Sequence, residues 1–424
     1  MSLISPSPPL SELNRRQVQW IGAGFIMTFA SMGGQTIFIA QFNTEIRSFF
    51  NLTDGQFGQL YMLATLASAI LISIVGNLAD RIGPRLLGIL CMVGLAVMTL
   101  VMSQVGNLVM LVLALFGLRF FGQGMLPHVA QTAMARWFNR FRGRALAFSQ
   151  MGYTLGEAIL PFSVTVGILA VGWRNVWIAV AGILIVAFIP IITFLLRDPP
   201  DGKRAKARGD VNPDGGEEGK VTGEHWTRAN VLKDPLFYLL VFGAMTLPAL
   251  ATIYFFHQAH LVGIKGWSVL TYTAWLPLMS ATNVIMALAT GFLVDRFGAF
   301  RILPFFLLPM GIASLVMASF NAQWAIPLFF MFVALSGGMA PSVAGALWAE
   351  IYGTAHIGGI RALAIAGMVF ASAAGPGISG MLIDANIDLA QQSWGNAIYC
   401  FAISALYLAL QPKLAARRNE MMAS

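Results

Sequence analysis

The chain has 424 residues, of which 57% are hydrophobic and only 10% are charged. Soluble domains carry about 25% charged residues, so this composition excludes a soluble globular protein and predicts that most of the chain lies in a bilayer. The formal net charge of +8 does not indicate nucleic-acid binding, because the sequence has no soluble domain to carry a basic surface.

Apolar stretches long enough to cross roughly 30 Å of hydrocarbon follow a polar N-terminal tail. The first is too long for a signal peptide and has no small-residue cleavage site after it, so it is predicted to be a retained span. The only long polar tract, 197–233, is rich in Pro, Gly and charge and predicts a flexible linker. The expected spans are about 18–41, 57–79, 85–104, 107–133, 145–170, 173–196, 235–262, 268–294, 299–320, 323–349, 360–383 and 392–411.

The predicted fold class is therefore an all-α membrane protein with 12 transmembrane helices in two pseudo-symmetric six-helix bundles. Five regions are expected: an N-terminal tail 1–17, a first bundle 18–196, a linker 197–233, a second bundle 234–412 and a C-terminal tail 413–424. With the N-terminus inside, the inner segments hold 22 of the 26 Lys and Arg. This bias places both termini and the linker in the cytoplasm. A bacterial inner membrane is the expected location.

A short charged motif occurs twice between apolar stretches. Gly76-Asn77-Leu78-Ala79-Asp80-Arg81-Ile82-Gly83 follows the second span, and Gly291-Phe292-Leu293-Val294-Asp295-Arg296-Phe297-Gly298 follows the eighth. Each copy has Asp-Arg four and five residues after its first Gly, and an Arg shortly after its last. The halves also share Arg-Ala-Leu-Ala, at 144–147 and 361–364, and an internal proline, Pro161 and Pro376. Internal repeats of this kind are typical of transporters with a solute site at mid-membrane.

These motifs give the chain a resemblance to the major facilitator superfamily over nearly its whole length. Residues 76–88 resemble the family's signature between the second and third helices, and 291–301 its weaker copy. Residues 118–124, Leu-Arg-Phe-Phe-Gly-Gln-Gly, resemble its fourth-helix pattern, and 375–380, Gly-Pro-Gly-Ile-Ser-Gly, resemble a Gly-Pro pattern of its fifth helix. Within the superfamily, 137–147 are similar to the monocarboxylate and oxalate/formate porters, although the eighth span lacks their arginine and the eleventh has no lysine.

The resemblance implies that the charged motifs act in gating. In the first copy, Asp80 near the inner end of a span is expected to accept hydrogen bonds from the start of a helix in the other half. The alternative is that the basic residues only fix membrane orientation. In the second half, Asp295, Arg296, Glu350 and Arg361 form either a matching charge network or a static surface cluster. The gating candidates are Gly76, Asp80, Arg81, Gly83, Arg85, Asp295, Arg296, Glu350 and Arg361.

Two ionisable residues are predicted to lie deep in spans, Arg119 in the fourth and Glu157 in the fifth. A charge at the bilayer centre costs about 2.5–3.5 kcal/mol even on insertion scales, so such residues pair or line a wet cavity. Glu157 is a candidate proton carrier, with Arg119 tuning it or binding an anionic solute. A permanent structural ion pair is the alternative.

Polar residues at helical spacing in the spans predict the lining of a solute site. Aromatics such as Trp275 are equally consistent with packing, and His257 and His260 are interpreted as polar residues near the outer surface rather than proton relays. The substrate-binding candidates are Gln35, Arg119, Gln123, Tyr153, Tyr254, Trp275 and Asn283, and the proton-coupling candidates are Glu157 and Arg119.

Together these features predict a secondary active transporter that moves a small organic solute by alternating access, coupled to a proton or a counter-solute. An organic anion such as a monocarboxylate is the leading class of solute, and multidrug or metabolite efflux is the alternative. A receptor or an intramembrane enzyme is a distant alternative, because the sequence shows no catalytic constellation at membrane depth and no sizeable soluble domain. No cofactor, metal or nucleotide is expected, the two cysteines form no framework, and the protein is expected to act as a monomer in the lipid bilayer.

Overall fold

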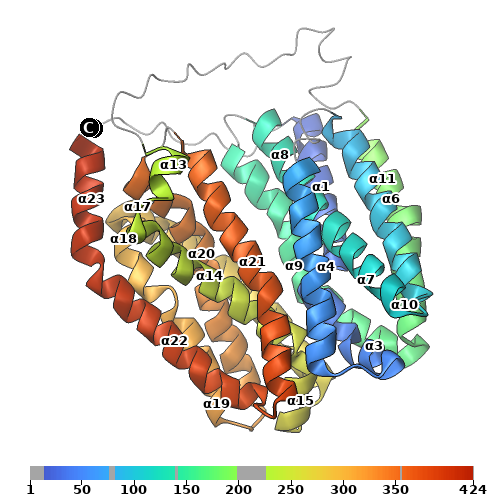
Figure 1. Cartoon of the computed structure of the whole chain (residues 1–424). Helices are drawn as coiled ribbons and strands as arrows, with labels where there is room; N and C mark the ends of the chain where they lie inside the picture. Colours follow the sequence, from blue (N-terminus) through green and yellow to red (C-terminus); the bar gives the residue numbers. More distant parts are fainter. Residues whose placement is uncertain (1–13, 76–81, 139–141, 198–225, 354–355, 424) are drawn as a thin grey trace. The chain divides into compact units, whose positions relative to one another are not determined.

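The computed structural model describes residues 14–75, 82–138, 142–197, 226–353 and 356–423, which form helices joined by short connections (Figure 1). These ranges contain no β-strand. They hold ten helices long and apolar enough to cross a membrane, or up to twelve if each of two bent helix pairs is one span. The prediction of an all-helical membrane protein is confirmed, and the predicted number of spans is the upper of these two values.

The first half of the chain contains one broken span and five further spans. Its helices are α1 (Arg15–Ala30), η2 (Ser31–Gly34), α2 (Thr36–Ile39), η3 (Ala40–Phe42), α3 (Asn43–Phe50), α4 (Asp54–Val75), α6 (Pro84–Ser103), α7 (Leu108–Gly117), η4 (Leu118–Met125), α8 (Leu126–Trp137), α9 (Arg142–Val171), α10 (Trp173–Ile183), η5 (Leu184–Phe188) and α11 (Ile189–Leu195). Here η4 and η5 are π-helical, and η2 and η3 are 3₁₀ helices.

The second half begins with a short helix that precedes the seventh span. Its helices are α13 (Arg228–Val231), α14 (Pro235–Phe256), α15 (Gln258–Lys265), α16 (Val269–Thr273), α17 (Leu276–Phe297), α18 (Ala299–Ile302), η6 (Leu303–Phe305), α19 (Leu308–Ser319), α20 (Ala325–Tyr352), α21 (Ile357–Asp384), α22 (Leu389–Ala409) and α23 (Gln411–Ala423). The main packing partners in this half are α17 with α20, α14 with α21, and α19 with α22.

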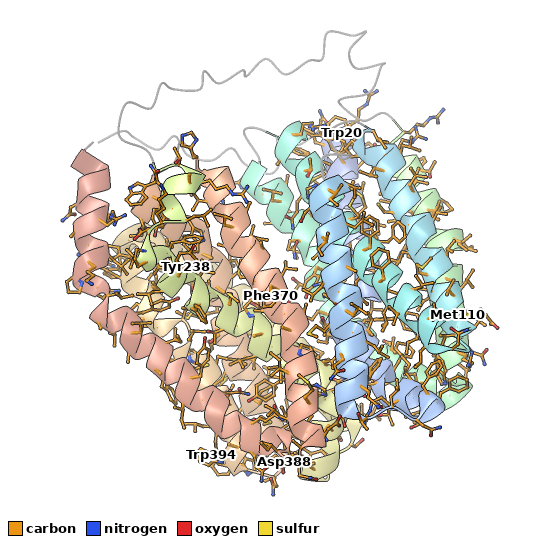
Figure 2. The ribbon with its side chains drawn as sticks, viewed as in Figure 1. Trp20, Met110, Tyr238, Phe370, Asp388 and Trp394 are labelled. Carbon is orange, nitrogen blue, oxygen red and sulfur yellow. The ribbon has the colours of Figure 1, made fainter. Side chains whose placement is uncertain are left out.

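Large apolar side chains lie exposed along the helices. Figure 2 labels Phe370, Trp394 and Tyr238, which are 54%, 49% and 47% exposed. Val186 and Phe292, in other spans, are more than three-quarters exposed, at 77% and 76%. Apolar surface on this scale is unfavourable in water. These side chains are therefore explained by contact with lipid, as expected for an integral multi-pass membrane protein.

The two copies of the charged motif end in the same backbone conformation. Gly83 precedes α6 with φ 84° and ψ 142°, and Gly298 follows α17 with φ 85° and ψ 150°. This region of the Ramachandran map is essentially restricted to glycine. The last glycine of each copy is thus required for the turn between two spans, and the sequence repeat is also a repeat in local structure.

The chain divides into two compact units, whose boundaries lie in the linker and also inside some of the spans. One comprises Met1–Phe38, Ala67–Leu160 and Gly167–Glu217, and the other comprises Ile39–Leu66, Pro161–Val166 and Glu218–Ser424. We call them the first and the second unit. The broken end of the first span and the start of α4 thus belong to the second unit.

Candidate functional site

The buried arginine of the fourth span lies in the first unit, in the π-helical segment η4. Arg119 is 1% exposed, and its Nη1 donates hydrogen bonds to the carbonyl oxygen of Gly34 at 3.2 Å and to Thr36 Oγ1 at 3.1 Å. π-Helical turns inside α-helices often occur at functional sites. The guanidinium is therefore fixed against the first span at the point where that span is interrupted.

The interruption of the first span makes these acceptors available. Gln35 has an extended backbone with φ −79° and ψ 149°, between η2 and α2. A regular helix would use the carbonyl of Gly34 in its own hydrogen-bond ladder, whereas a discontinuous helix leaves backbone groups to bind side chains or solutes. Gln35 itself is buried, at 7% exposed.

Two glycines bring the interrupted span against η4. A Cβ on Gly34 would collide with the carbonyl oxygen of Leu118, and a Cβ on Gly122 would lie 2.6 Å from the Cα of Gly34. Small residues at helix contacts allow backbones to approach in membranes. This close approach sets the distance over which Arg119 reaches Thr36.

The fifth span contributes a tyrosine and a carboxylate to the same unit. The Tyr153 hydroxyl donates to Glu157 Oε1 at 3.4 Å, and both Glu157 and Arg119 act electrostatically on that hydroxyl. Glu157 is buried, at 7% exposed. The structure thus brings Arg119, Tyr153 and Glu157 into one neighbourhood. We call these three residues and Thr36 the Arg119 cluster.

The small face of α9 orients these side chains. A Cβ on Gly152 would collide with the carbonyl oxygen of Phe25, and one on Gly156 would collide with the side chain of Met32. In addition, the Thr28 hydroxyl donates to the carbonyl oxygen of Ser149 at 2.5 Å. Since Tyr153 and Glu157 directly follow these glycines, packing of the small face against the first span fixes their direction.

The remaining substrate-binding candidates have mixed surroundings. Gln123 lies on η4, partly exposed. In the second unit, Tyr254 is 1% exposed and donates to Ser393 Oγ at 2.8 Å, which ties α14 to α22. Trp275 precedes α17 and is 40% exposed, and Asn283 lies beside Gly337 of α20. These residues stay candidates, and only Tyr254 has an evident packing role.

The gating candidates are described in part. Gly76, Asp80 and Arg81 lie outside the described residues. Arg85 Nη1 donates to the carbonyl oxygen of Arg197 at 3.3 Å, whereas the side chains of Asp295, Arg296 and Arg361 are exposed. Glu350 accepts hydrogen bonds from the backbone N–H groups of Ala299 at 2.8 Å and Phe300 at 3.2 Å. Glu350 therefore caps the start of α18 within its own half of the chain, and the contact across halves expected of Asp80 falls on residues outside those described.

A polar cluster at the linker side of α14 was not expected from the sequence. Asp234 caps α14 by accepting from Leu236 N, and its Oδ2 accepts from the Tyr352 hydroxyl at 2.9 Å and from Arg417 Nη1 at 3.2 Å. The Arg417 guanidinium also lies 4.3 Å from the ring centre of Trp226. An Asp directly before a helix that begins with Pro is a recognisable cap signal. No sequence signal identifies its distant partners, Tyr352 and Arg417.

His257 lies in the turn that ends the seventh span, where the sequence places it, but its side chain is buried rather than part of a polar loop. His257 is 0% exposed and contacts both Asp54 and Pro376, which lie far from it in the chain. Asp54 opens α4, and Pro376 lies inside the continuous helix α21. Its contacts are tertiary, so sequence spacing alone does not reveal them.

Comparisons with known proteins agree with this architecture. The family model of the Major Facilitator Superfamily matches residues 24–339. The chain is 27% identical over 324 residues to the MFS transporter asaE of Aspergillus flavus, covering 71% of this chain and 68% of that protein. It is 26% identical over 300 residues to a probable L-galactonate transporter of Escherichia coli, covering 70% of this chain and 58% of that protein.

A third relative is a probable sulfoacetate transporter, SauU, of Cupriavidus necator, at 26% identity over 233 residues, covering 55% of this chain and 50% of that protein. The alignments thus span less than two thirds of the galactonate and sulfoacetate transporters. Among solved structures, a bacterial homologue of the human lysosomal transporter Spinster in an inward-facing, unoccupied conformation has a TM-score of 0.70 at 15% identity. That match covers 97% of this chain and 98% of the other, and it shows a shared fold.

Proposed function

Because the chain belongs to the Major Facilitator Superfamily, we propose that it is a secondary active transporter that moves a small organic anion across a membrane by alternating access, coupled to protons. The family supports transport of a small solute. The anion, the coupling ion and the residues involved are the proposed part.

The observation that carries the proposal is the buried Arg119 at the interrupted first span. A guanidinium in a span is costly unless it is paired or lines a wet cavity, and its planar donors suit a carboxylate or sulfonate. Its Nη1 is held by Gly34 and Thr36, so the group is oriented before any solute arrives. Two of the relatives are named as transporters of organic acids, galactonate and sulfoacetate, which favours the same class of solute here.

Glu157 is the proposed proton carrier. A carboxylate stays ionised beside a guanidinium, and withdrawal of that positive charge lets burial favour the protonated form. An anion that binds Arg119 would withdraw part of that charge from Glu157. Binding of the anion and of a proton are then mutually favourable, which is the requirement for cotransport.

Reconstituted counterflow tests the proposal. Proteoliposomes are loaded with galactonate, sulfoacetate, lactate, a neutral sugar or a cationic dye, and exchange is measured at several pH values and membrane potentials. We expect exchange of at least one organic acid, a loss of about tenfold or more in Arg119→Gln, and partial retention in Arg119→Lys, since an arginine bond to an anion is worth about 1.5–3 kcal/mol.

The matched control is Arg16→Gln, an exposed arginine in the first turn of α1, which we expect to exchange at the wild-type rate. Glu157→Gln is expected to retain exchange but to lose proton-driven accumulation. Exchange of cationic dyes without organic acids would instead support an efflux transporter. Proton-driven uptake by Glu157→Gln at the wild-type level would exclude Glu157 as the carrier.

A further inference from the structure

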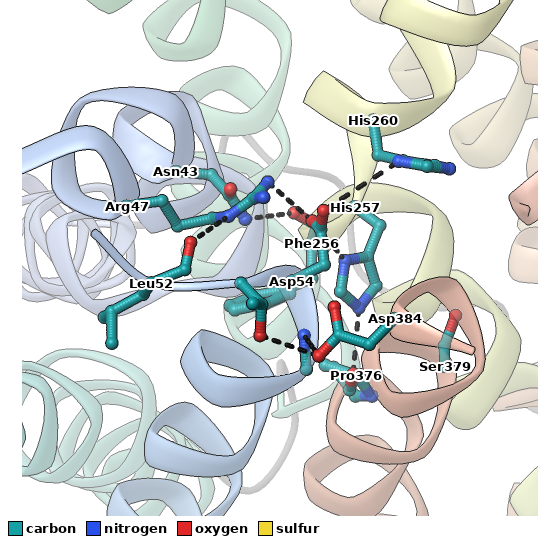
Figure 3. Close-up of polar contacts among 12 residues, drawn as sticks. Asn43, Arg47, Leu52, Asp54, Phe256, His257, His260, Pro376, Ser379 and Asp384 are labelled. Carbon is teal, nitrogen blue, oxygen red and sulfur yellow. Dashed lines mark hydrogen bonds and ion pairs between the residues drawn. The ribbon is translucent and has the colours of Figure 1, made fainter. Parts of the chain in front are cut away.

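A buried histidine joins three helices of the second unit at the end of α14 farthest from the linker. His257 Nε2 lies 2.8 Å from the carbonyl oxygen of Pro376 on α21, and its Nδ1 lies 3.4 Å from Oδ1 of Asp54 on α4 (Figure 3). The side chain of His257 is 0% exposed and that of Asp54 is 9% exposed. We call Arg47, Asp54, His257 and the Pro376 carbonyl the His257 latch.

The two partners of His257 determine how many protons the ring carries. A carbonyl oxygen only accepts, so at 2.8 Å the Nε2 of His257 must bear a hydrogen. In the neutral ring Nδ1 would then present a lone pair to the Asp54 carboxylate, and the two would repel each other. In the imidazolium both nitrogens are donors: Nε2 lies at hydrogen-bond distance from the Pro376 carbonyl, and Nδ1 lies at ion-pair distance from Asp54 without forming a hydrogen bond. These contacts suit an imidazolium that donates from Nε2 to Pro376 and lies at ion-pair distance from Asp54.

Arg47 favours the ionised form of the Asp54 carboxyl. Its Nη1 lies 2.7 Å from Asp54 Oδ1, and its Nε donates to the carbonyl oxygen of Leu52 at 3.3 Å. A guanidinium at this distance favours the ionised carboxylate. Asp54 is thus the acceptor in the latch, and His257 is the proton-binding group.

The other charged groups of this neighbourhood fit the same assignment. Asp384 of α21 accepts from Thr53 Oγ1 at 2.7 Å and from Gly55 N at 3.1 Å, beside Asp54. A protonated His257 and Arg47 then balance the carboxylates of Asp54 and Asp384.

His260 on α15 lies 3.9 Å from Asp54 Oδ2, and Asp388 at the start of α22 acts on it from a distance. Burial lowers the pKa of His260, so His260 favours the neutral form. It therefore does not compete with His257 for the proton.

Close packing of glycines allows the latch to form. A Cβ on Gly58 would lie 2.6 Å from the carbonyl oxygen of Pro376, and one on Gly380 would lie 2.6 Å from the carbonyl oxygen of Asp54. The rings of Phe57 and Tyr61 also pack on Phe256, with centroids 5.2 Å and 4.5 Å away. The contacts of His257 and of Phe256 both depend on this close approach of α4 to α14 and α21. Moving α4 away from the other two helices would therefore break both sets of contacts together.

We propose that His257 is a proton-binding site whose occupancy holds α4 against α14 and α21. The closed latch carries one proton more than the separated helices, so acidification favours the closed form and alkalinisation favours the open form. This follows from linkage, since a proton bound only in one state shifts the equilibrium toward it.

Opening of the latch is a transport step only if the proposed function holds, but the proton-linked equilibrium itself does not depend on transport. The experiment is therefore a distance measurement without solute. In a Cys91→Ala and Cys400→Ala background, spin labels are attached at Gln56→Cys on α4 and Trp394→Cys on α22. Both native side chains are exposed; Gln56 lies in the first turn of α4 and Trp394 in the second turn of α22.

Pulsed electron resonance distances are recorded in proteoliposomes from pH 5 to pH 8. For the wild-type latch we expect two distance populations whose ratio changes by up to about tenfold per pH unit, as one linked proton requires, with the shorter distance favoured at low pH. In His257→Gln, whose amide still donates to Pro376, we expect a change of less than about twofold over the whole range. His260→Gln, the matched control, is expected to keep the wild-type response.

Asp54→Asn provides an independent variant, because it removes the carboxylate that requires the proton and should also abolish the response. A flat wild-type profile, an unchanged profile in His257→Gln, or loss of the response in His260→Gln would overturn the inference. Absence of transport with a normal distance response would count against the proposed function and leave the latch intact. Normal transport with flat distances would count against the latch alone.

Discussion

The guanidinium of Arg119 donates a hydrogen bond to the hydroxyl of Thr36 at 3.1 Å, joining η4 to the point where the first span resumes as α2. A bond from a charged donor contributes about 1.5–3 kcal/mol. Thr36→Val removes this acceptor while keeping the shape of the side chain. We expect a lower Tm in detergent and an approximately tenfold or greater loss of organic-anion affinity, measured by thermal unfolding and by concentration-dependent exchange. Thr36→Ser keeps the hydroxyl and is expected to resemble the wild type, and equal behaviour of the two variants would contradict this role.

Gly34 permits the close contact between the first span and η4. Gly34→Ala places a methyl group on the carbonyl oxygen of Leu118, so we expect a large loss of folded protein in size-exclusion and thermal-unfolding assays. The neighbouring Gly33→Ala is the matched control, since its Cβ would lie an ordinary 3.7 Å from the nearest side-chain atom of Leu95. Strained backbone contacts cost several kcal/mol when the neighbour cannot move, whereas open positions tolerate a methyl group. A stable Gly34→Ala variant would show that the two backbones can separate without loss.

The two glycines of the second charged motif have different roles. Gly298 has φ 85°, which a residue with a Cβ adopts only at a cost of about 1–3 kcal/mol. Gly291 lies within α17, and nothing lies within 4 Å of its added Cβ. We therefore expect Gly298→Ala to lower the Tm and Gly291→Ala to leave it unchanged or raise it. A larger loss of Tm in Gly291→Ala than in Gly298→Ala would mean that glycine is required for the space around the motif rather than for its backbone conformation.

Glu350 stabilises the start of α18 by accepting from two backbone N–H groups. Glu350→Ala leaves those donors unsatisfied, and we expect a loss of about 1–2 kcal/mol, the usual effect of removing a cap. Glu350→Gln retains one acceptor oxygen and should be intermediate. Asp295→Asn, at an exposed position, serves as the control and is expected to be neutral in chemical or thermal unfolding.

The burial of His260 predicts a pH-dependent stability of opposite sign to that of the latch. Its pKa is lowered in the folded protein, so the unfolded chain binds the proton more strongly. Stability associated with His260 is therefore complete above the ordinary imidazole pKa, near 6.5, and falls as the pH drops through that value. Thermal unfolding from pH 8 to pH 5 should show a smaller acid destabilisation in His260→Gln than in the wild type. An identical pH profile in the two proteins would exclude this contribution.

Much of the fold could be predicted from the sequence because the bilayer simplifies the problem. Any segment that crosses the hydrocarbon must satisfy its backbone internally, so long apolar stretches become helices whatever their neighbours are. The predicted boundaries accordingly lie within a few residues of α4, α6 and α22, and of the span Trp173–Leu195 that contains α10, η5 and α11. The interruption at Gln35 was not predicted, because it depends on how the first span packs against η4 rather than on hydropathy.

The candidate site was predictable only at the level of its most costly residues. Arg119 and Glu157 stand out in the sequence because a charged residue inside a span is costly unless it is paired or solvated. Thr36, the partner of Arg119, does not stand out, since threonine is common in membrane helices. The burial of His257 was not predictable for the same reason: a histidine at the end of a span is ordinary until its partners from other helices are known.

By itself, the sequence determined that this protein spans the membrane, that its two halves repeat a charged glycine motif, and that two ionisable residues lie within its spans. These properties follow from composition, periodicity and local spacing, which act over a few turns of helix. Only the tertiary structure decided that Arg119 is oriented by an interrupted span and that a buried His257 lies between Pro376 and Asp54. Those relationships join residues separated by tens to hundreds of positions, and they depend on backbone approaches of a few ångströms that no sequence pattern specifies.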